Sequence, residues 1–150
     1  AASRAEIEHD ADRDATAAGQ LSAARCRAAL PDDDAKQAAW AAMLSGVEGS
    51  LSGYELTATA QGFWQADQAE LLAGYVPRYF AALAEAAAGG ATGLARAWCV
   101  HGFPHHAADA ATVRAGERCL ETGALTGSLR RLLADQLEDL RRSAAVRSAY

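Results

Sequence analysis

Large side chains and chain-breaking residues are scarce in this sequence of 150 residues. It has three prolines, one methionine and 7% aromatic residues, and alanine supplies much of its hydrophobic half. Alanine carries no helix-propensity penalty, while few β-branched residues are present to favour sheet. No apolar run approaches the ~20 residues that a membrane helix needs. The composition therefore predicts an all-α protein with no membrane-spanning segment.

Several kinds of catalytic and binding motif are also absent. No Gly-x-Ser-x-Gly elbow, phosphate-binding loop or Cys-x-x-Cys pair occurs. Cys26, Cys99 and Cys119 are widely spaced, which indicates reduced thiols rather than a disulfide framework. The net charge of −5 is spread along the chain, and this disfavours nucleic acid as a partner. No signal peptide is visible, so we expect a cytoplasmic protein. The missing initiator Met suggests a piece of a longer chain.

Caps and apolar stripes divide the chain into about eight helices joined by short turns. Thr16 and Asp109 have the character of N-caps, and Ser52 with Glu55 forms a capping box. Thr92 is a further candidate cap. Pro31 and the three aspartates after it indicate a helix start, because proline fits the first turn and carboxylates favour the N-terminal end. The expected helices cover residues 4–11, 16–30, 31–45, 52–64, 71–88, 92–101, 109–122 and about 127–140, with loops at Asp12–Asp14 and Gly46–Gly53.

The clearest apolar stripe runs from Leu71 to Leu83, where large side chains recur every three or four residues. Gly74 and Pro77 interrupt it, so we expect a kink or break there. A second stripe lies in the last helix and consists of Leu129, Leu132, Leu133, Leu137 and Leu140. Short antiparallel helices without a clean repeat period predict an irregular right-handed array, an α-α superhelix closer to HEAT or armadillo proteins than to a consensus repeat. Residues 1–150 are expected to form a single helical-repeat domain.

Candidate functional side chains are few. His101, His105 and His106 lie close together, but Pro104 breaks the helix between them, so solvated loop histidines are a better interpretation than a metal site. The aromatic residues Tyr54, Phe63, Trp64, Tyr75, Tyr79 and Phe80 favour a buried core, with a peptide groove as the alternative. Gln65, Asp67 and Gln68 are expected to cap helix ends.

The order of several short motifs resembles the C-terminal part of actinobacterial zinc aminopeptidases of the aminopeptidase N (gluzincin) family. The motifs are Thr16-Ala17-Ala18-Gly19, Pro31 with Ala35-Lys36 and Ala39-Trp40, Ser52 to Glu55, Gly62-Phe63-Trp64-Gln65, Glu70-Leu71-Leu72 with Tyr75-Val76, Arg78-Tyr79-Phe80, Gly102-Phe103-Pro104 and Leu129-Arg130-Arg131. The family often has proline at the position of Gly74 and a charged residue at that of Pro77. These differences suggest a local change in the helix break.

The resemblance implies a fragment of the C-terminal helical domain of a larger enzyme. The family's zinc motif, His-Glu-x-x-His, is absent from this chain, so the resemblance carries over no catalytic, metal-binding or cofactor-binding residue. The zinc belongs to the catalytic domain of the same parent chain, which is the expected partner together with peptide substrates. The domain is expected to enclose the active-site chamber and help select peptides, with Arg78 and Arg96 as possible contacts. A free-standing α-solenoid that binds another protein is the alternative.

Overall fold

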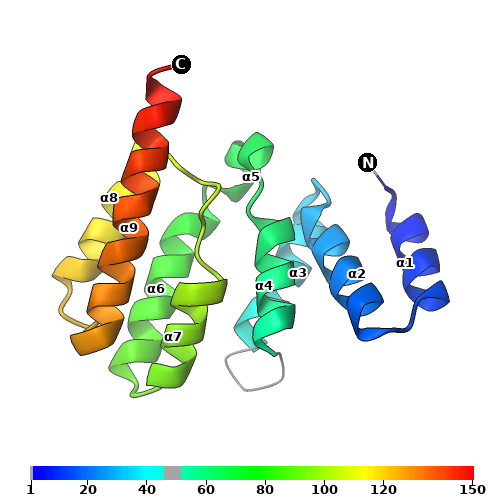
Figure 1. Cartoon of the computed structure of the whole chain (residues 1–150), viewed down its shortest axis with the longest axis horizontal. Helices are drawn as coiled ribbons and strands as arrows, with labels where there is room; N and C mark the ends of the chain where they lie inside the picture. Colours follow the sequence, from blue (N-terminus) through cyan, green and yellow to red (C-terminus); the bar gives the residue numbers. More distant parts are fainter. Residues whose placement is uncertain (1, 46–51) are drawn as a thin grey trace. The chain divides into compact units, whose positions relative to one another are not determined.

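The computed structural model describes residues 2–45 and 52–150, and Figure 1 shows their fold. Nine α-helices and one short 3₁₀ turn, without any β-strand, account for the regular structure of these residues. The all-α prediction is therefore confirmed. The helices gather into two compact units, residues 1–71 and 72–150. The single domain and the right-handed HEAT-like superhelix stay predictions.

The first unit is built around α2. Its helices are α1 (Arg4–Arg13), α2 (Ala17–Ala29), α3 (Asp33–Ser45) and α4 (Gly53–Phe63). Helix α2 packs against each of the other three, and α3 also packs against α4. The larger buried side chains are Trp40, Met43, Leu56, Phe63 and Trp64. A smaller apolar cluster of Ile7, Ala11 and Ala23, with Leu30 against it, fastens α1 to α2.

Helices α2 and α4 approach each other at backbone distance. A Cβ atom on Gly62 would overlap the main-chain oxygen of Arg25 and lie 3.0 Å from Cβ of Ala28. Only glycine leaves room for that approach. The nearby Ala58 and Ala60 of α4 and Ala23 and Ala28 of α2 are also small and buried. Small side chains therefore permit the closest helix contact in this unit rather than merely filling its core.

The second unit is a four-helix arrangement. Its helices are α6 (Tyr75–Ala88), α7 (Thr92–His101), α8 (Ala110–Glu121) and α9 (Gly127–Ser148). Helix α6 packs against α7 and α8, and α9 packs against the same two helices (Figure 1). The 3₁₀ turn (Ala66–Gln68) and the short α5 (Ala69–Leu72) precede this unit along the chain.

An aromatic cluster fills the centre of the second unit. The Tyr79 ring lies 5.1 Å from Phe80, 5.3 Å from Trp98 and 6.0 Å from Phe103, measured between ring centroids. Its hydroxyl donates a 2.8 Å hydrogen bond to the main-chain oxygen of Trp98. Leucines of the α9 stripe complete the core: Leu129, Leu133, Leu137 and Leu140 are buried, and Leu132 is half-buried.

Most predicted helix ends are confirmed. Ser52 and Glu55 form the capping box, and Thr16 and Asp109 accept hydrogen bonds from main-chain amides. The stripe breaks between Leu72 and Tyr75, so that Pro77 falls in the first turn of α6, where its missing N–H costs nothing. Gly90 follows that helix with a φ of 80°, a conformation that glycine adopts without strain.

Four predicted boundaries are wrong. Thr92 is not a cap: Ala91 holds that position, without a side-chain bond, and Thr92 is the first helical residue. Asp12 and Arg13 belong to α1, which is two residues longer than expected; a capping box at Ser3 and Glu6 stabilises its N-terminal end. Pro31 precedes α3, and Asp32 accepts the amide hydrogen bond of Ala35 instead. Gly53 begins α4; residues 46–51 of the predicted loop lie outside the described residues.

The core interpretation of the aromatic residues is confirmed for five of the six. Phe63 and Trp64 are buried in the first unit, and Tyr75, Tyr79 and Phe80 are buried in the second. Tyr54 is the exception, because 81% of it is exposed in the first turn of α4. Helical spacing predicted burial for all six, but the Tyr54 side chain extends into solvent from the first turn of α4.

The α2–α4 approach predicts the effect of a single methyl group. Gly62→Ala should lower the free energy of unfolding by about 1–3 kcal/mol, because the clash is with backbone and cannot be relieved by a rotamer change. Gly93→Ala is the matched control: it lies in α7, its Cβ meets nothing within 4 Å, and it should be neutral or stabilising by up to about 1 kcal/mol. Urea unfolding midpoints measure both. Equal midpoints for the two variants would refute the close approach.

Truncation of the second core should also be costly. Phe80→Ala and Leu133→Ala should each destabilise the protein by about 2–5 kcal/mol, because both side chains are buried and leave a cavity. His105→Ala, at an exposed loop position, should change stability little. Guanidinium unfolding curves compare the three. A near-zero change for Phe80→Ala would mean that the α6 stripe faces solvent.

Candidate functional site

A hollow lies among the helices of the first unit. It has a volume of about 790 Å³, which is in the range of ligand-binding pockets, roughly 300–1,000 Å³. All four helices of the unit line it. Its apolar lining consists mostly of alanine, since short side chains leave the space between helices unfilled; the lining alanines are Ala17, Ala24, Ala28, Ala35, Ala38, Ala39 and Ala42.

The charged residues that line this hollow are engaged with other groups. Arg27 forms a bidentate pair with Glu8, at 2.6 and 2.8 Å, and the Glu55 carboxylate accepts a 3.1 Å hydrogen bond from the Ser52 amide. Arg4 lies 3.5 Å from Asp32. An uncharged apolar group therefore suits the hollow better than an ion. The exposed ring of Tyr54 lies among the lining residues and offers an amphipathic contact.

Three side chains cap the C-terminal ends of α2 and α4. The Lys36 amino group donates to the main-chain oxygens of Ala28 and Phe63, at 2.6 and 3.2 Å. Gln65 donates to Gln61 and Gly62 at the end of α4, and Gln68 donates to Ala29 at the end of α2. The predicted capping role of Gln65 and Gln68 is confirmed. Asp67 is exposed in the 3₁₀ turn between them.

No role was expected for Lys36, although Ala35-Lys36 is one of the short motifs of the family resemblance. Lys36 is fully buried, and burial lowers its pKa to about 8 although the charges of Asp32 and Asp67 act in the opposite direction. A signal was present in the sequence, because Lys36 is four residues before Trp40 and seven before Met43. That spacing places it on the buried face of α3.

Arg78 and Arg96, the predicted chamber contacts, are both exposed residues of the second unit. Arg78 lies in the first half of α6, with its guanidinium carbon 4.9 Å from the centroid of the Tyr75 ring. Stacking of this kind holds the planar donor fork in place. Arg96 lies on α7, where its charge lowers the pKa of Cys99 by a small amount against the larger effect of burial.

The histidines form no common site. His101 ends α7, while His105 and His106 lie in the loop that follows, as the loop interpretation predicted. The His105 ring packs against Phe103 with 4.9 Å between ring centroids, and the partial loss of water in this contact, together with the charge of the neighbouring His106, lowers the pKa of His105. Within residues 2–45 and 52–150, no group of three His, Cys, Asp or Glu side chains is placed to hold a metal ion.

The cysteines behave as three separate thiols. Cys26 is exposed, whereas Cys99 and Cys119 are buried, and all three are free. Burial raises the pKa of Cys99 to about 12 and that of Cys119 to about 11. A thiol with so high a pKa is a poor nucleophile at neutral pH, so neither buried cysteine suits covalent catalysis.

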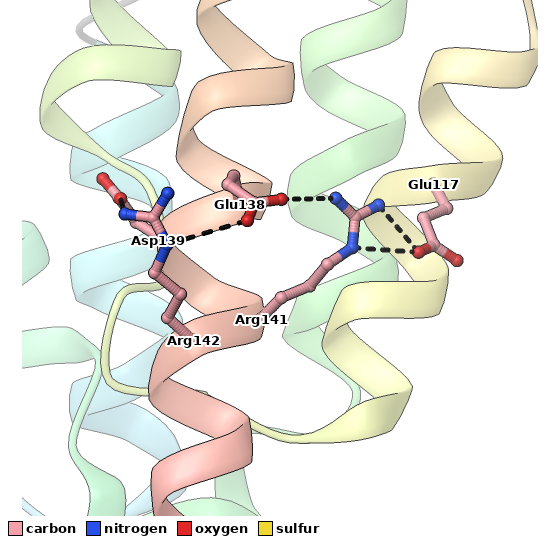
Figure 2. Close-up of polar contacts among 5 residues, drawn as sticks. All are labelled: Glu117, Glu138, Asp139, Arg141 and Arg142. Carbon is pink, nitrogen blue, oxygen red and sulfur yellow. Dashed lines mark hydrogen bonds and ion pairs between the residues drawn. The ribbon is translucent and has the colours of Figure 1, made fainter.

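An ion-pair network crosses from α8 to α9 on the surface of the second unit (Figure 2). Arg141 lies 2.8 Å from Glu117 and 3.4 Å from Glu138, and Arg142 pairs with Glu138 and Asp139. These groups are 41–71% exposed, so each pair contributes about 1 kcal/mol or less. The arginines face acidic partners of their own chain. The network therefore strengthens the α8–α9 contact rather than forming a binding site.

Across the described ranges, none of the helices combines the length and apolarity needed to span a bilayer. The model of the ERAP1-like C-terminal domain family matches residues 1–142. Aminopeptidase N of Streptomyces lividans is 33% identical over 144 residues, which make up 96% of this chain and 17% of that protein. The chain thus spans less than a fifth of the relative, and it belongs to the ERAP1-like C-terminal domain family.

Proposed function

We propose that this chain is a noncatalytic C-terminal domain of a zinc-dependent aminopeptidase, an enzyme that removes N-terminal residues from peptides. The family match over residues 1–142 is the observation that carries the proposal, and the similarity to an aminopeptidase N supports it. The matched part of that relative is only 17% of its length, which leaves ample chain for a catalytic domain. That domain supplies the zinc and the activated water that hydrolyses the peptide bond.

The role of this domain is to pack against the catalytic domain, enclose the chamber and help to select peptides. Its chemistry suits such a role, because its described surface offers hydrogen-bond donors and an apolar hollow but no convincing nucleophile or general base. The partners are the catalytic domain of the same chain and the distal part of the peptide. We place the whole protein in the cytoplasm, in keeping with reduced thiols.

Arg78 is the better of the two candidate contacts to a peptide. Its stacking on Tyr75 restricts the guanidinium before any peptide arrives, so less conformational entropy is lost on binding. The fork of donors matches the two oxygens of a peptide carboxylate. Arg96 offers the same chemistry from α7.

A free-standing protein-binding module is the second candidate function. The alanine-lined hollow and the exposed Tyr54 favour it, since both provide apolar contact area without an unpaired charge. The two candidates differ in one respect that is easily checked. Only a peptidase domain should depend on a zinc-bearing catalytic region in the same gene product.

Kinetics of the full-length protein test the proposed peptide contact. Arg78→Ala should raise the KM for long peptides by about two- to fivefold, the effect of an exposed charged contact, and leave short aminoacyl substrates unchanged. Arg78→Lys should recover only part of the loss, because it keeps the charge but not the fork. Arg96→Ala should raise the KM for long peptides by a smaller factor, because no ring among the described residues stacks on its guanidinium to restrict it in advance.

Arg131→Ala is the control, because Arg131 is an exposed arginine of the apolar-striped helix α9. It should leave both classes of substrate unaffected. If Arg78→Ala and Arg96→Ala also leave the KM for long peptides unchanged, neither arginine contacts the substrate. If all three arginine variants change the KM for long and for short substrates equally, the effect is one of stability.

A further inference from the structure

Lys36 is the single lysine of the chain, and its side chain is completely buried. A lone lysine in a chain that otherwise uses arginine for its positive charge stands out, because lysine is almost never fully buried without a partner. Its position inside α3, between α2 and α4, accounts for the burial. The proposed peptidase role uses neither its charge nor its hydrogen bonds.

The Lys36 amino group lies where two helices end. Ala28 is in the last turn of α2, and Phe63 is the last residue of α4. Carbonyl groups in the last turn lack partners within the helix and carry the negative end of its dipole. Both oxygens accept hydrogen bonds from Lys36, at 2.6 and 3.2 Å, and the nitrogen lies 5.4 Å from the centroid of the Phe63 ring. The side chain thus joins three helices through one nitrogen.

The ionisable groups that act on this nitrogen are few. Asp32, which precedes α3, and Asp67, in the 3₁₀ turn, favour the charged form. The ends of α2 and α4 contribute peptide oxygens rather than side-chain charges. Loss of water around the nitrogen favours the neutral amine. This effect is larger than the attraction of the two aspartates for the charged form, so the pKa of Lys36 falls from 10.5 to about 8.

We propose that Lys36 is a pH-sensitive clamp that holds the C-terminal ends of α2 and α4 together, and that loss of its proton in alkaline solution stabilises the first unit. A neutral amine keeps two N–H donors, which is the number of hydrogen bonds that Lys36 makes. Deprotonation therefore preserves the clamp while it removes the cost of burying a charge.

Proton linkage gives the direction in which stability changes with pH. Between pH 8 and 10.5 the unfolded chain binds a proton that the folded chain has lost, so stability rises with pH through this window. The unfolding constant should fall roughly 100-fold between pH 7.5 and 10.5 through Lys36 alone. Cys99 and Cys119 act in the opposite direction above pH 9, because their folded pKa values are raised. The cysteines contribute equally in a Lys36 variant, so the difference between the two proteins isolates the effect of Lys36.

NMR of the intact 150-residue chain with ¹³C-labelled lysine tests the proposal directly, because a single lysine gives a single set of side-chain signals. The Cε shift should titrate with a midpoint near 8 in the folded protein and near 10.5 in 8 M urea. A folded midpoint at or above 10 would overturn the proposal, since it would mean a hydrated amine.

Unfolding curves at pH 7.5 and 10.5 give the second test. The ratio of the unfolding constant of the original chain to that of Lys36→Met should fall roughly 100-fold over this range. Lys36→Gln, which keeps a donor but cannot be charged, should retain more stability than Lys36→Met at pH 7.5 and show the same pH dependence as Lys36→Met. An unchanged ratio would overturn the proposal. Should Lys36→Met fail to fold, the NMR midpoint alone decides.

Discussion

The close approach of α2 and α4 is the constraint on which the first unit depends. The main-chain oxygen of Arg25 occupies the space that a Cβ on Gly62 would need. A chain rich in alanine gains little from the burial of each residue, so it must bring its helices close together to form enough contacts. That approach brings the ends of both helices near Lys36 and Gln68, which satisfy their free carbonyl groups. Close packing and end-capping therefore depend on each other.

Sequence patterns predicted the helices well because their signals are local. The capping box at Ser52 and Glu55 and the break before Tyr75 follow from residues within a few positions of each other. The Lys36 contacts and the alanine-lined hollow were not predicted, since both arise only when helices distant in sequence pack together. Thr92 failed as a cap because the helix begins one residue earlier than expected: Ala91, which has no side-chain oxygen, holds the cap position.

The two units reach stability by different routes, and this difference bears on function. The second unit has a core of large rings around Tyr79, while the first combines buried rings such as Trp40 and Phe63 with a close contact between small residues and leaves a hollow. A domain proposed to wall a peptide chamber needs a rigid scaffold and a surface that accepts varied side chains. The aromatic core provides rigidity, and the alanine lining with its paired charges provides an apolar surface.

The proposed role of this chain is that of a noncatalytic partner of a peptidase domain. Sedimentation velocity on the chain mixed with the separately produced remainder of its full-length protein tests this role most directly, once circular dichroism has shown that both are folded. We expect a one-to-one complex whose formation restores the cleavage of long peptides. Two species that sediment independently at micromolar concentration, with cleavage unchanged by the mixture, would contradict it.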